Sequence, residues 1–103
     1  MINARTELLG AVRFADKTVD DILCYKIERN CFGYNKECLS PKNTTNIVSD
    51  LDKLDFDYDD GYGIQELFGI VWFKDGSWLE RGEYDGSEWW TYKFTPEIPQ
   101  ELL

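Results

Sequence analysis

The stretch ELFGIVWFKDGSWLERGEYDGSEWWTYKF, residues 66–94, decides the fold. It contains three runs rich in aromatic and β-branched residues, separated by the dipeptides Asp75–Gly76 and Asp85–Gly86. Asp-Gly between such runs is the strongest short-range signal for a β-hairpin. The stretch therefore predicts a three-stranded antiparallel meander, with strands at 66–74, 77–84 and 87–94.

The sequence before the meander predicts two helices and two more strands. Leu8 and Val12 lie at helical spacing, and Asn3 is a suitable N-cap for that first helix. Apolar residues such as Leu51 and Leu54 give the second helix the same pattern. We expect an α+β domain, two short helices packed on an antiparallel sheet. Its elements in order are a helix at 3–15, strands at 21–30 and 33–39, a helix at 43–54 and the three strands of the meander.

The length of 103 residues is that of a single domain covering 1–103. Pro96 and Pro99 prevent further strand pairing, so residues 95–103 are expected to form an extended tail. No apolar run is long enough for a bilayer, and MINARTELLG at the start lacks the pattern of a secretory signal. These features predict a cytoplasmic protein that makes no membrane contact.

The residue inventory argues against an enzyme. The chain has no histidine, which excludes Ser–His–Asp and Cys–His catalysis, and no other nucleophile motif is present. Its three cysteines, Cys24, Cys31 and Cys38, form no Cys-x-x-Cys pair, so we read them as reduced structural thiols and expect no cofactor. A hairpin turning near Cys31 would place Cys24 opposite Cys38.

Two-residue turns at both Asp-Gly sites would divide the meander into two faces. The face expected to pack on the helices carries Ile70, Trp72, Leu79, Arg81, Trp90, Tyr92 and Phe94. The other face carries Val71, Phe73, Trp78, Glu80, Tyr84 and Trp89. This second aromatic face is either a protein-binding patch or is covered by a helix or by the tail. The same register sets Glu83 opposite Glu88, an unfavourable like-charge pair unless it lies at a wet edge.

Charge is distributed unevenly along the chain. The formal net charge is −9. Residues 1–49 hold six acidic and seven basic side chains, whereas residues 50–103 hold fourteen acidic and four basic ones. Such a surface repels nucleic acids and anionic membranes and attracts basic proteins or cations, although solubility alone is also a sufficient reason for it.

The segment DFDYDDGYG, residues 55–63, concentrates this charge. In an extended backbone Asp55, Asp57 and Asp59 point the same way, one carboxylate every ~6.6 Å, while Phe56 and Tyr58 point toward the core. Such a row imitates the charge of a nucleic-acid backbone at lower density. It is suited to a lysine- and arginine-lined groove.

Calcium binding is an alternative use of this segment. Asp55, Asp57, Asp59 and Glu66 occupy positions one, three, five and twelve of an EF-hand-like loop at 55–66. Position six is Asp60 where the loop needs glycine, and a strand follows where a helix should begin.

The block DFDYDDGYGIQELFGIVWFKDGSWLERGEYDGSEWW, with PEIP after it, resembles small uncharacterised acidic proteins of bacteriophages and mobile elements. In size and acidity the chain also resembles phage inhibitors of host defence, including anti-CRISPR proteins, several of which imitate nucleic acid. The resemblance covers about a third of the chain and implies no catalytic residues.

The leading hypothesis is therefore a non-enzymatic acidic inhibitor, monomeric or dimeric. Its partner would be a basic host protein such as a CRISPR effector or another nuclease, with no direct nucleic-acid binding. The alternatives are the calcium-binding module and a phage structural or assembly protein that oligomerises through the aromatic face. The candidate partner-binding residues are Asp50, Asp52, Asp55, Asp57, Asp59, Asp60, Trp78, Tyr84 and Trp89.

Overall fold

A computed structural model describes residues 1–31, 35–39, 47–61 and 63–103, with side chains outside 30–48. Its described residues form a small α+β fold with two helices and two antiparallel sheets, which confirms the predicted class. In chain order the elements are β1 (Ile2–Asn3), α1 (Ala4–Phe14), the 3₁₀ turn η1 (Val19–Asp21), β2 (Ile22–Cys31), β3 (Asn35–Leu39), α2 (Ile47–Asp52), β4 (Asp57–Tyr58), β5 (Leu67–Phe73), β6 (Trp78–Tyr84), β7 (Ser87–Lys93) and η2 (Gln100–Leu102).

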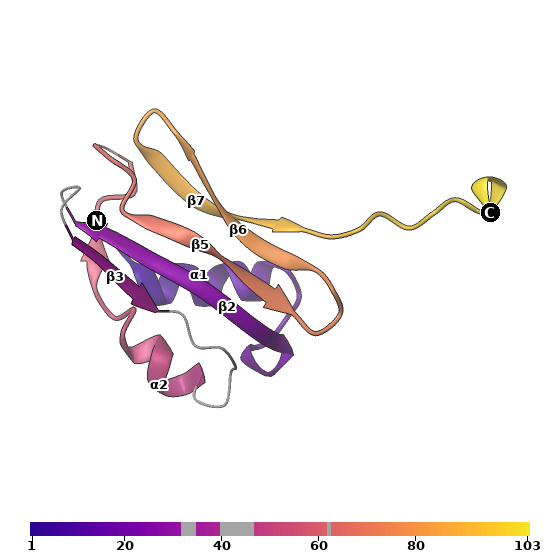
Figure 1. Cartoon of the computed structure of the whole chain (residues 1–103), viewed down its shortest axis with the longest axis horizontal. Helices are drawn as coiled ribbons and strands as arrows, with labels where there is room; N and C mark the ends of the chain where they lie inside the picture. Colours follow the sequence, from indigo (N-terminus) through magenta and orange to yellow (C-terminus); the bar gives the residue numbers. More distant parts are fainter. Residues whose placement is uncertain (32–34, 40–46, 62) are drawn as a thin grey trace.

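The larger sheet has the strand order β3-β2-β5-β6-β7, and every neighbouring pair is antiparallel. Helix α1 lies behind this sheet (Figure 1). The Asn3 side chain caps α1 by accepting a hydrogen bond from the Thr6 backbone N–H at 3.0 Å, as its position before the apolar pattern predicts. Strands β1 and β4 form a second, two-stranded sheet.

The core lies between the helices and the sheet. Leu8 and Val12 of α1 are buried there, and so are Leu51 of α2 and Leu54, two residues after the end of α2. The strands contribute the remaining large buried side chains: Ile22, Tyr25, Ile27, Tyr58, Leu67, Val71, Phe73 and Leu79. The start of the second predicted helix, residues 43–46, lies outside the described residues.

The predicted faces of β5 are wrong because the connection from β5 to β6 is longer than two residues. Trp72 pairs with Trp78, and the four residues 74–77 connect the end of β5 at Phe73 to the start of β6. At this connection the Phe73 N–H donates to the Ser77 carbonyl, and Gly76 adopts φ +91°. The extra residue reverses the alternation of β5, which sends Val71 and Phe73 into the core. Ile70 and Trp72 lie on the opposite face of the sheet.

The second turn is the two-residue turn that was predicted. Tyr84 pairs with Ser87, and Asp85 and Gly86 both have positive φ. Glu83 does pair with Glu88, but the two carboxylates have different partners: Glu83 accepts from the Gly86 N–H, whereas Glu88 turns inward.

The predicted cysteine pairing is also wrong. Strands β2 and β3 pair Cys31 with Asn35, so Cys38 lies opposite Glu28. Cys24 pairs instead with Trp72 across the other side of β2 and is a free thiol. The hairpin turns later in the sequence than was expected, which shifts every cross-strand partner.

The tail, residues 95–103, leaves β7 and projects away from the rest of the molecule (Figure 1). All its residues are exposed, and it is extended as far as Pro99 before the short 3₁₀ turn η2. Within the described residues no helix is both long and apolar enough to cross a membrane.

Candidate functional site

The acidic segment lies on a fixed backbone. Strand β4 pairs with β1. The first residues of α1 donate backbone hydrogen bonds to the residues just before β4, from Ala4 N to the Phe56 carbonyl at 2.9 Å and from Arg5 N to the Leu54 carbonyl at 2.9 Å. Tyr58 is only 1% exposed and Phe56 packs against the core. Both aromatic side chains therefore anchor the segment in the way its alternation predicts.

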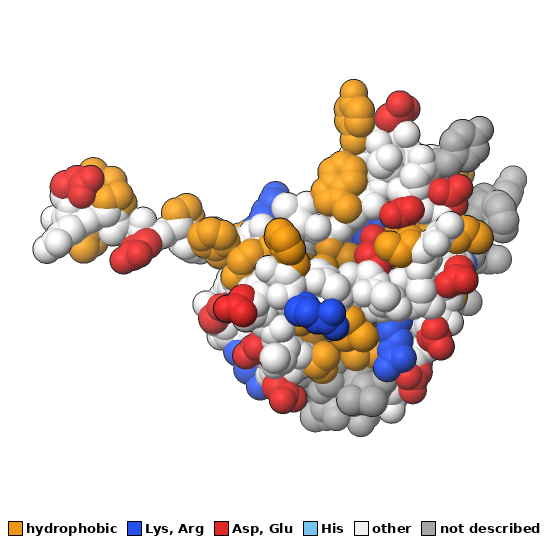
Figure 2. Space-filling view, turned by 180° about the vertical axis from the view of Figure 1, so that it is seen from behind, with side chains coloured by type: hydrophobic (Ala, Val, Ile, Leu, Met, Phe, Trp, Pro, Cys, Tyr) orange, Lys and Arg blue, Asp and Glu red, His pale blue; other side chains and the backbone are white. Residues whose placement is uncertain are grey.

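The carboxylates of this segment stand outward. Asp52, Asp55, Asp57 and Asp59 are exposed, and we call these four residues the acidic row. Acidic side chains follow the edge of the molecule that carries β4 in the view from the helix side (right in Figure 2). Within the described part of the chain, none of the four has an ion pair with a lysine or arginine. The row is thus available to an outside cation.

Local hydrogen bonds fix parts of this row. Asp55 accepts from the Asn3 side-chain amide at 2.9 Å, and Asp59 accepts from the Gly61 N–H at 3.0 Å. The Asp60 carbonyl accepts from the Glu88 N–H at 2.7 Å, which joins the end of the segment to β7. These contacts hold the carboxylates in place without neutralising them.

Asp50 has a different role from the one predicted. Its carboxylate accepts a hydrogen bond from the Tyr25 hydroxyl and lies 3.5 Å from the Lys53 ammonium. Burial and then the Asp50 carboxylate raise the pKa of Tyr25 above its ordinary value. Asp50 therefore ties α2 to β2, and its side chain is only 15% exposed.

The predicted calcium ligands do not converge. Among the described residues no group of three or more acidic or cysteine side chains could hold a metal ion. Glu66 lies 3.9 Å from Arg29, and Asp57 belongs to a paired strand. Because β4 is extended at Asp57, the backbone does not curl around a centre there. The calcium alternative has no geometric support.

Among the described residues no helix lies on the face of the large sheet opposite α1 (Figure 1), and that face is aromatic; we call it the uncovered face. Trp78, Tyr84 and Trp89 all lie on it, as predicted, together with Phe68, Ile70 and Trp72 of β5.

Two of these indoles are held in place. The Trp89 ring lies over Gly82, where an added Cβ would come within 2.8 Å of its Nε1, and that Nε1 donates to Thr91 at 2.9 Å. Trp78 Nε1 donates to Glu80 at 3.2 Å. Fixed aromatic side chains lose little entropy on binding.

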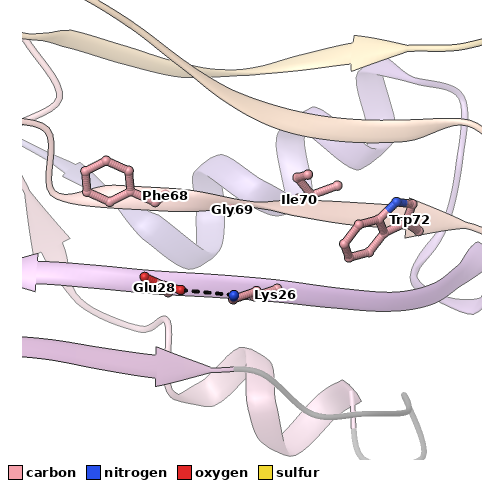
Figure 3. Close-up of a pocket in the computed structure, with 6 residues that line it drawn as sticks. All are labelled: Lys26, Glu28, Phe68, Gly69, Ile70 and Trp72. Carbon is pink, nitrogen blue, oxygen red and sulfur yellow. Dashed lines mark ion pairs between the residues drawn. The ribbon is translucent and has the colours of Figure 1, made fainter.

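A depression of about 270 Å³ lies on this uncovered face. Phe68, Ile70 and Trp72 of β5 form one side of it, and Lys26 and Glu28 of β2 form the other (Figure 3). The Lys26 ammonium lies 3.5 Å from the Glu28 carboxylate, and the lysine side chain is 63% exposed. We call this depression the β2–β5 groove. Sequence reasoning missed it because it assigned Ile70 and Trp72 to the core.

The nine predicted partner-binding residues do not form one surface. The acidic row lies at the β1–β4 edge, on the helix side of the large sheet. The Asp60–Glu88 hydrogen bond brings the end of the acidic segment to the strand that carries Trp89, next to the hairpin with Tyr84. Trp78 pairs with Lys93 at the opposite end of β6 and belongs with the uncovered face alone.

A buried ionic network lies beneath the meander. The Arg81 guanidinium is 3.1 Å from the Glu7 carboxylate and 2.5 Å from that of Glu88, and it donates to the Tyr58 hydroxyl at 3.0 Å. The Arg81 side chain is 2% exposed and that of Glu88 is fully buried. Glu88 also accepts the backbone N–H groups of Glu66 and Leu67 at 2.8 and 3.0 Å. The network joins α1, β4, β6 and β7 and fixes the start of β5.

Electrostatics within the network are consistent with a structural role. Burial alone would lower the pKa of Arg81, but Glu7, Tyr58 and Glu88 raise it above its ordinary value, so the guanidinium stays charged. Burial and the Glu7 carboxylate raise the pKa of Tyr58, which keeps its hydroxyl protonated as a donor to Glu7. Neither Arg81 nor Glu88 is open to a substrate.

No protein-family model matches the chain, and no curated protein or solved structure shows significant similarity to it. Function must therefore be inferred from its own surfaces.

Proposed function

We propose that this protein is a non-enzymatic inhibitor that binds the nucleic-acid-binding surface of a basic protein. The observation that supports this most strongly is the acidic row. Three of its exposed carboxylates, Asp55, Asp57 and Asp59, lie on the segment held by β1 and by the buried Tyr58 side chain, and the fourth, Asp52, ends α2. A partner would meet a surface that is already ordered. Binding then costs little conformational entropy.

The acidic row carries charge of the same sign as a nucleic-acid backbone. The distance between its charges is of the same order of magnitude. Alternate residues of an extended segment lie ~6.6 Å apart, and a nucleic-acid strand carries one charge per about 3.4 Å. Acidic side chains at this spacing occupy lysine and arginine sites otherwise taken by phosphates. Attraction over longer range comes from the net charge of −9, which speeds encounter at low salt.

The class of target follows from this chemistry. A nuclease, such as a CRISPR effector, exposes the basic channel that such a surface fits, and an inhibitor carried by a phage would act in the cytoplasm of its host cell. Direct binding to nucleic acid or to an anionic membrane is disfavoured by the same negative charge. Tyr84 and Trp89, next to the end of the acidic segment, supply an apolar anchor.

Charge reversal tests the proposal. Asp52 and Asp57 are exposed and have no side-chain contact described, so D52K/D57K changes the surface without removing a structural bond. The matched control D20K/E101K changes two exposed acids elsewhere by the same charge. In pull-downs from a bacterial lysate, we expect the wild type to retain nucleic-acid-binding proteins that duplex DNA displaces. Retention should fall at least about tenfold, 1.4 kcal/mol, in D52K/D57K only.

A purified CRISPR nuclease makes the test specific. The wild type and the D20K/E101K control should inhibit DNA cleavage, and D52K/D57K should not. Equal behaviour of both double variants would mean that total charge, and not the row, determines binding. Retention that DNA does not displace would contradict occupation of the nucleic-acid groove.

A second function is favoured by a different surface. The uncovered aromatic face is what a phage structural or assembly protein would use to oligomerise, since contiguous exposed apolar surface marks protein contacts. Sedimentation velocity over a concentration series distinguishes the two: an assembly protein forms large, open-ended oligomers, whereas an inhibitor stays a monomer or a closed dimer.

A further inference from the structure

The tail has the sequence spacing of a polyproline ligand, and the backbone of its second proline has the matching conformation. It contains Pro96-Glu97-Ile98-Pro99, two prolines at the spacing PxxP, and Pro99 has φ −59° and ψ 144°, which is polyproline II geometry. Ile98 and Leu102 are 59% and 73% exposed. The only hydrogen bonds described for the tail are internal to its last turn. Apolar side chains are thus displayed on an extended segment in which every residue is exposed.

The β2–β5 groove has the properties of a receptor for such a segment. Polyproline segments with the PxxP spacing dock in grooves lined by aromatic side chains, because the ligand is already extended and loses little entropy. Phe68 and Trp72 project from β5 on the same side of the sheet, with Ile70 between them (Figure 3).

Length and charge both fit. Phe68 and Trp72 are four residues apart on an extended strand, a separation of about 13 Å. Thr95 and Pro99, also four residues apart in the extended tail, are separated by about 12 Å at the polyproline II rise. Glu97 lies between the two prolines, and the exposed Lys26 ammonium lies on the far side of the groove from the aromatic row.

We propose that the tail of one copy binds the β2–β5 groove of a second copy, giving a closed dimer with two reciprocal tail–groove contacts. The tail leaves β7 directed away from its own groove (Figure 1). To reach that groove it would have to reverse at Phe94–Thr95 and cross β6, whereas a second copy meets it without a bend. Reciprocal exchange of an extended segment closes after two copies and forms no filament. This dimer does not use the acidic row and stands independently of the inhibitor proposal.

Sedimentation velocity of the full chain tests this. We expect a concentration-dependent monomer–dimer equilibrium for the wild type. I98D changes an exposed tail residue and W72A removes a wall of the groove, and each should weaken dimerisation at least tenfold. A mixture of I98D and W72A still contains one intact tail and one intact groove, so it should form heterodimers where neither variant alone dimerises.

A charge exchange guards against misfolding of W72A. K26E and E97K each place like charges together in the dimer and should weaken it. The double variant K26E/E97K restores the contact between the two copies and should bind more tightly than either single variant, although Glu28 then lies beside a second carboxylate. A synthetic peptide of residues 93–103 should bind the wild-type groove and shift the indole NMR signal of Trp72.

Three results would overturn the proposal. The first is a wild-type protein that remains monomeric at every concentration, whether its tail is free or folds onto its own groove. The second is a dimer that I98D leaves unchanged. The third is a double variant, K26E/E97K, no better than either single variant.

Discussion

Arg81 is the residue on which most of the buried polar contacts depend. Replacing it with methionine keeps much of its volume but leaves the Glu7 and Glu88 carboxylates without their cation. We expect R81M to lower the free energy of unfolding by about 3–5 kcal/mol, the cost of leaving one half of a buried pair. Urea unfolding measures this. K93M, which removes an exposed pair with Glu80, is the control and should cost no more than about 1 kcal/mol.

The sequence indicated only half of this network. Alternation along β6 places Arg81 on the same face as the buried Leu79, so a buried arginine that needs a partner was foreseeable. Its partner Glu7 is 74 residues away, and no local pattern connects the two. Glu88 was read as one of an unfavourable pair with Glu83, because cross-strand register cannot show which of two carboxylates turns inward.

Tyr25 makes stability depend on alkaline pH. Y25F loses the hydrogen bond to Asp50, so at pH 7 it should be about 1 kcal/mol less stable than the wild type. In the folded state the pKa of Tyr25 is raised, so its contribution is complete below the unfolded pKa of about 10 and falls as pH rises above it. The wild type should then lose about 1.4 kcal/mol per pH unit relative to Y25F. Urea unfolding at pH 7 and pH 11 should show the difference disappearing; a constant difference would contradict the pKa shift.

At the scale of elements, two glycines should respond to alanine in opposite ways. Gly69 lies in β5 against β2, where an added Cβ would come within 2.3 Å of the Lys26 carbonyl oxygen and 3.0 Å of the Ile27 Cα. G69A must push the two strands apart, and we expect it to lower the free energy of unfolding by more than about 1 kcal/mol. Gly10 is exposed in α1, and a Cβ added there would have nothing within 4 Å. We therefore expect G10A to raise the free energy of unfolding by about 0.5–1 kcal/mol.

Thermal or urea unfolding of the two variants beside the wild type gives the sign of each change. A neutral G69A would mean that β2 and β5 separate without cost. The groove lies over this same strand pair, so a destabilised G69A should also dimerise less, which G10A should not.

Helices and strands long enough to show a hydrophobic pattern were predictable from the sequence, and two-residue strands were not. Helix α1 has its cap, its apolar stripe and eleven residues, and its predicted bounds differ from the observed ones by one residue at each end. Strands β1 and β4 have two residues each, too few for any alternation to be visible. The faces of β5 depended on the length of one turn, and Asp75 decides that length by accepting hydrogen bonds from the N–H and hydroxyl of Ser77.

At the scale of the whole molecule, the candidate surface built from one short segment was predictable from the sequence, and the surface built from distant strands was not. The acidic row was predictable because its charge and its aromatic anchors alternate within one short segment. The β2–β5 groove was not, because it needs the register of β2 against β5, two strands that are far apart in the sequence. The molecule therefore carries two surfaces of different chemistry, one charged and one aromatic, on opposite sides of the large sheet.

These two surfaces should respond to salt in opposite directions. Two copies that each carry a net charge of −9 repel one another, and this repulsion acts over a longer distance than the attraction within the two Lys26–Glu97 pairs. Raising NaCl from about 50 to 300 mM shortens the Debye length, so the dimer should become several-fold tighter. Retention of basic nucleic-acid-binding proteins should weaken over the same range, because it depends on attraction between opposite charges.

The variant D52K/D57K separates the two effects. Its smaller net charge should already tighten the dimer at 50 mM NaCl, while it binds the basic partner poorly at any salt concentration. Sedimentation velocity and DNA-displaceable retention, measured on the same samples, provide both readouts. A dimer that weakens with salt would mean that ion pairs, and not the aromatic groove, hold the two copies together.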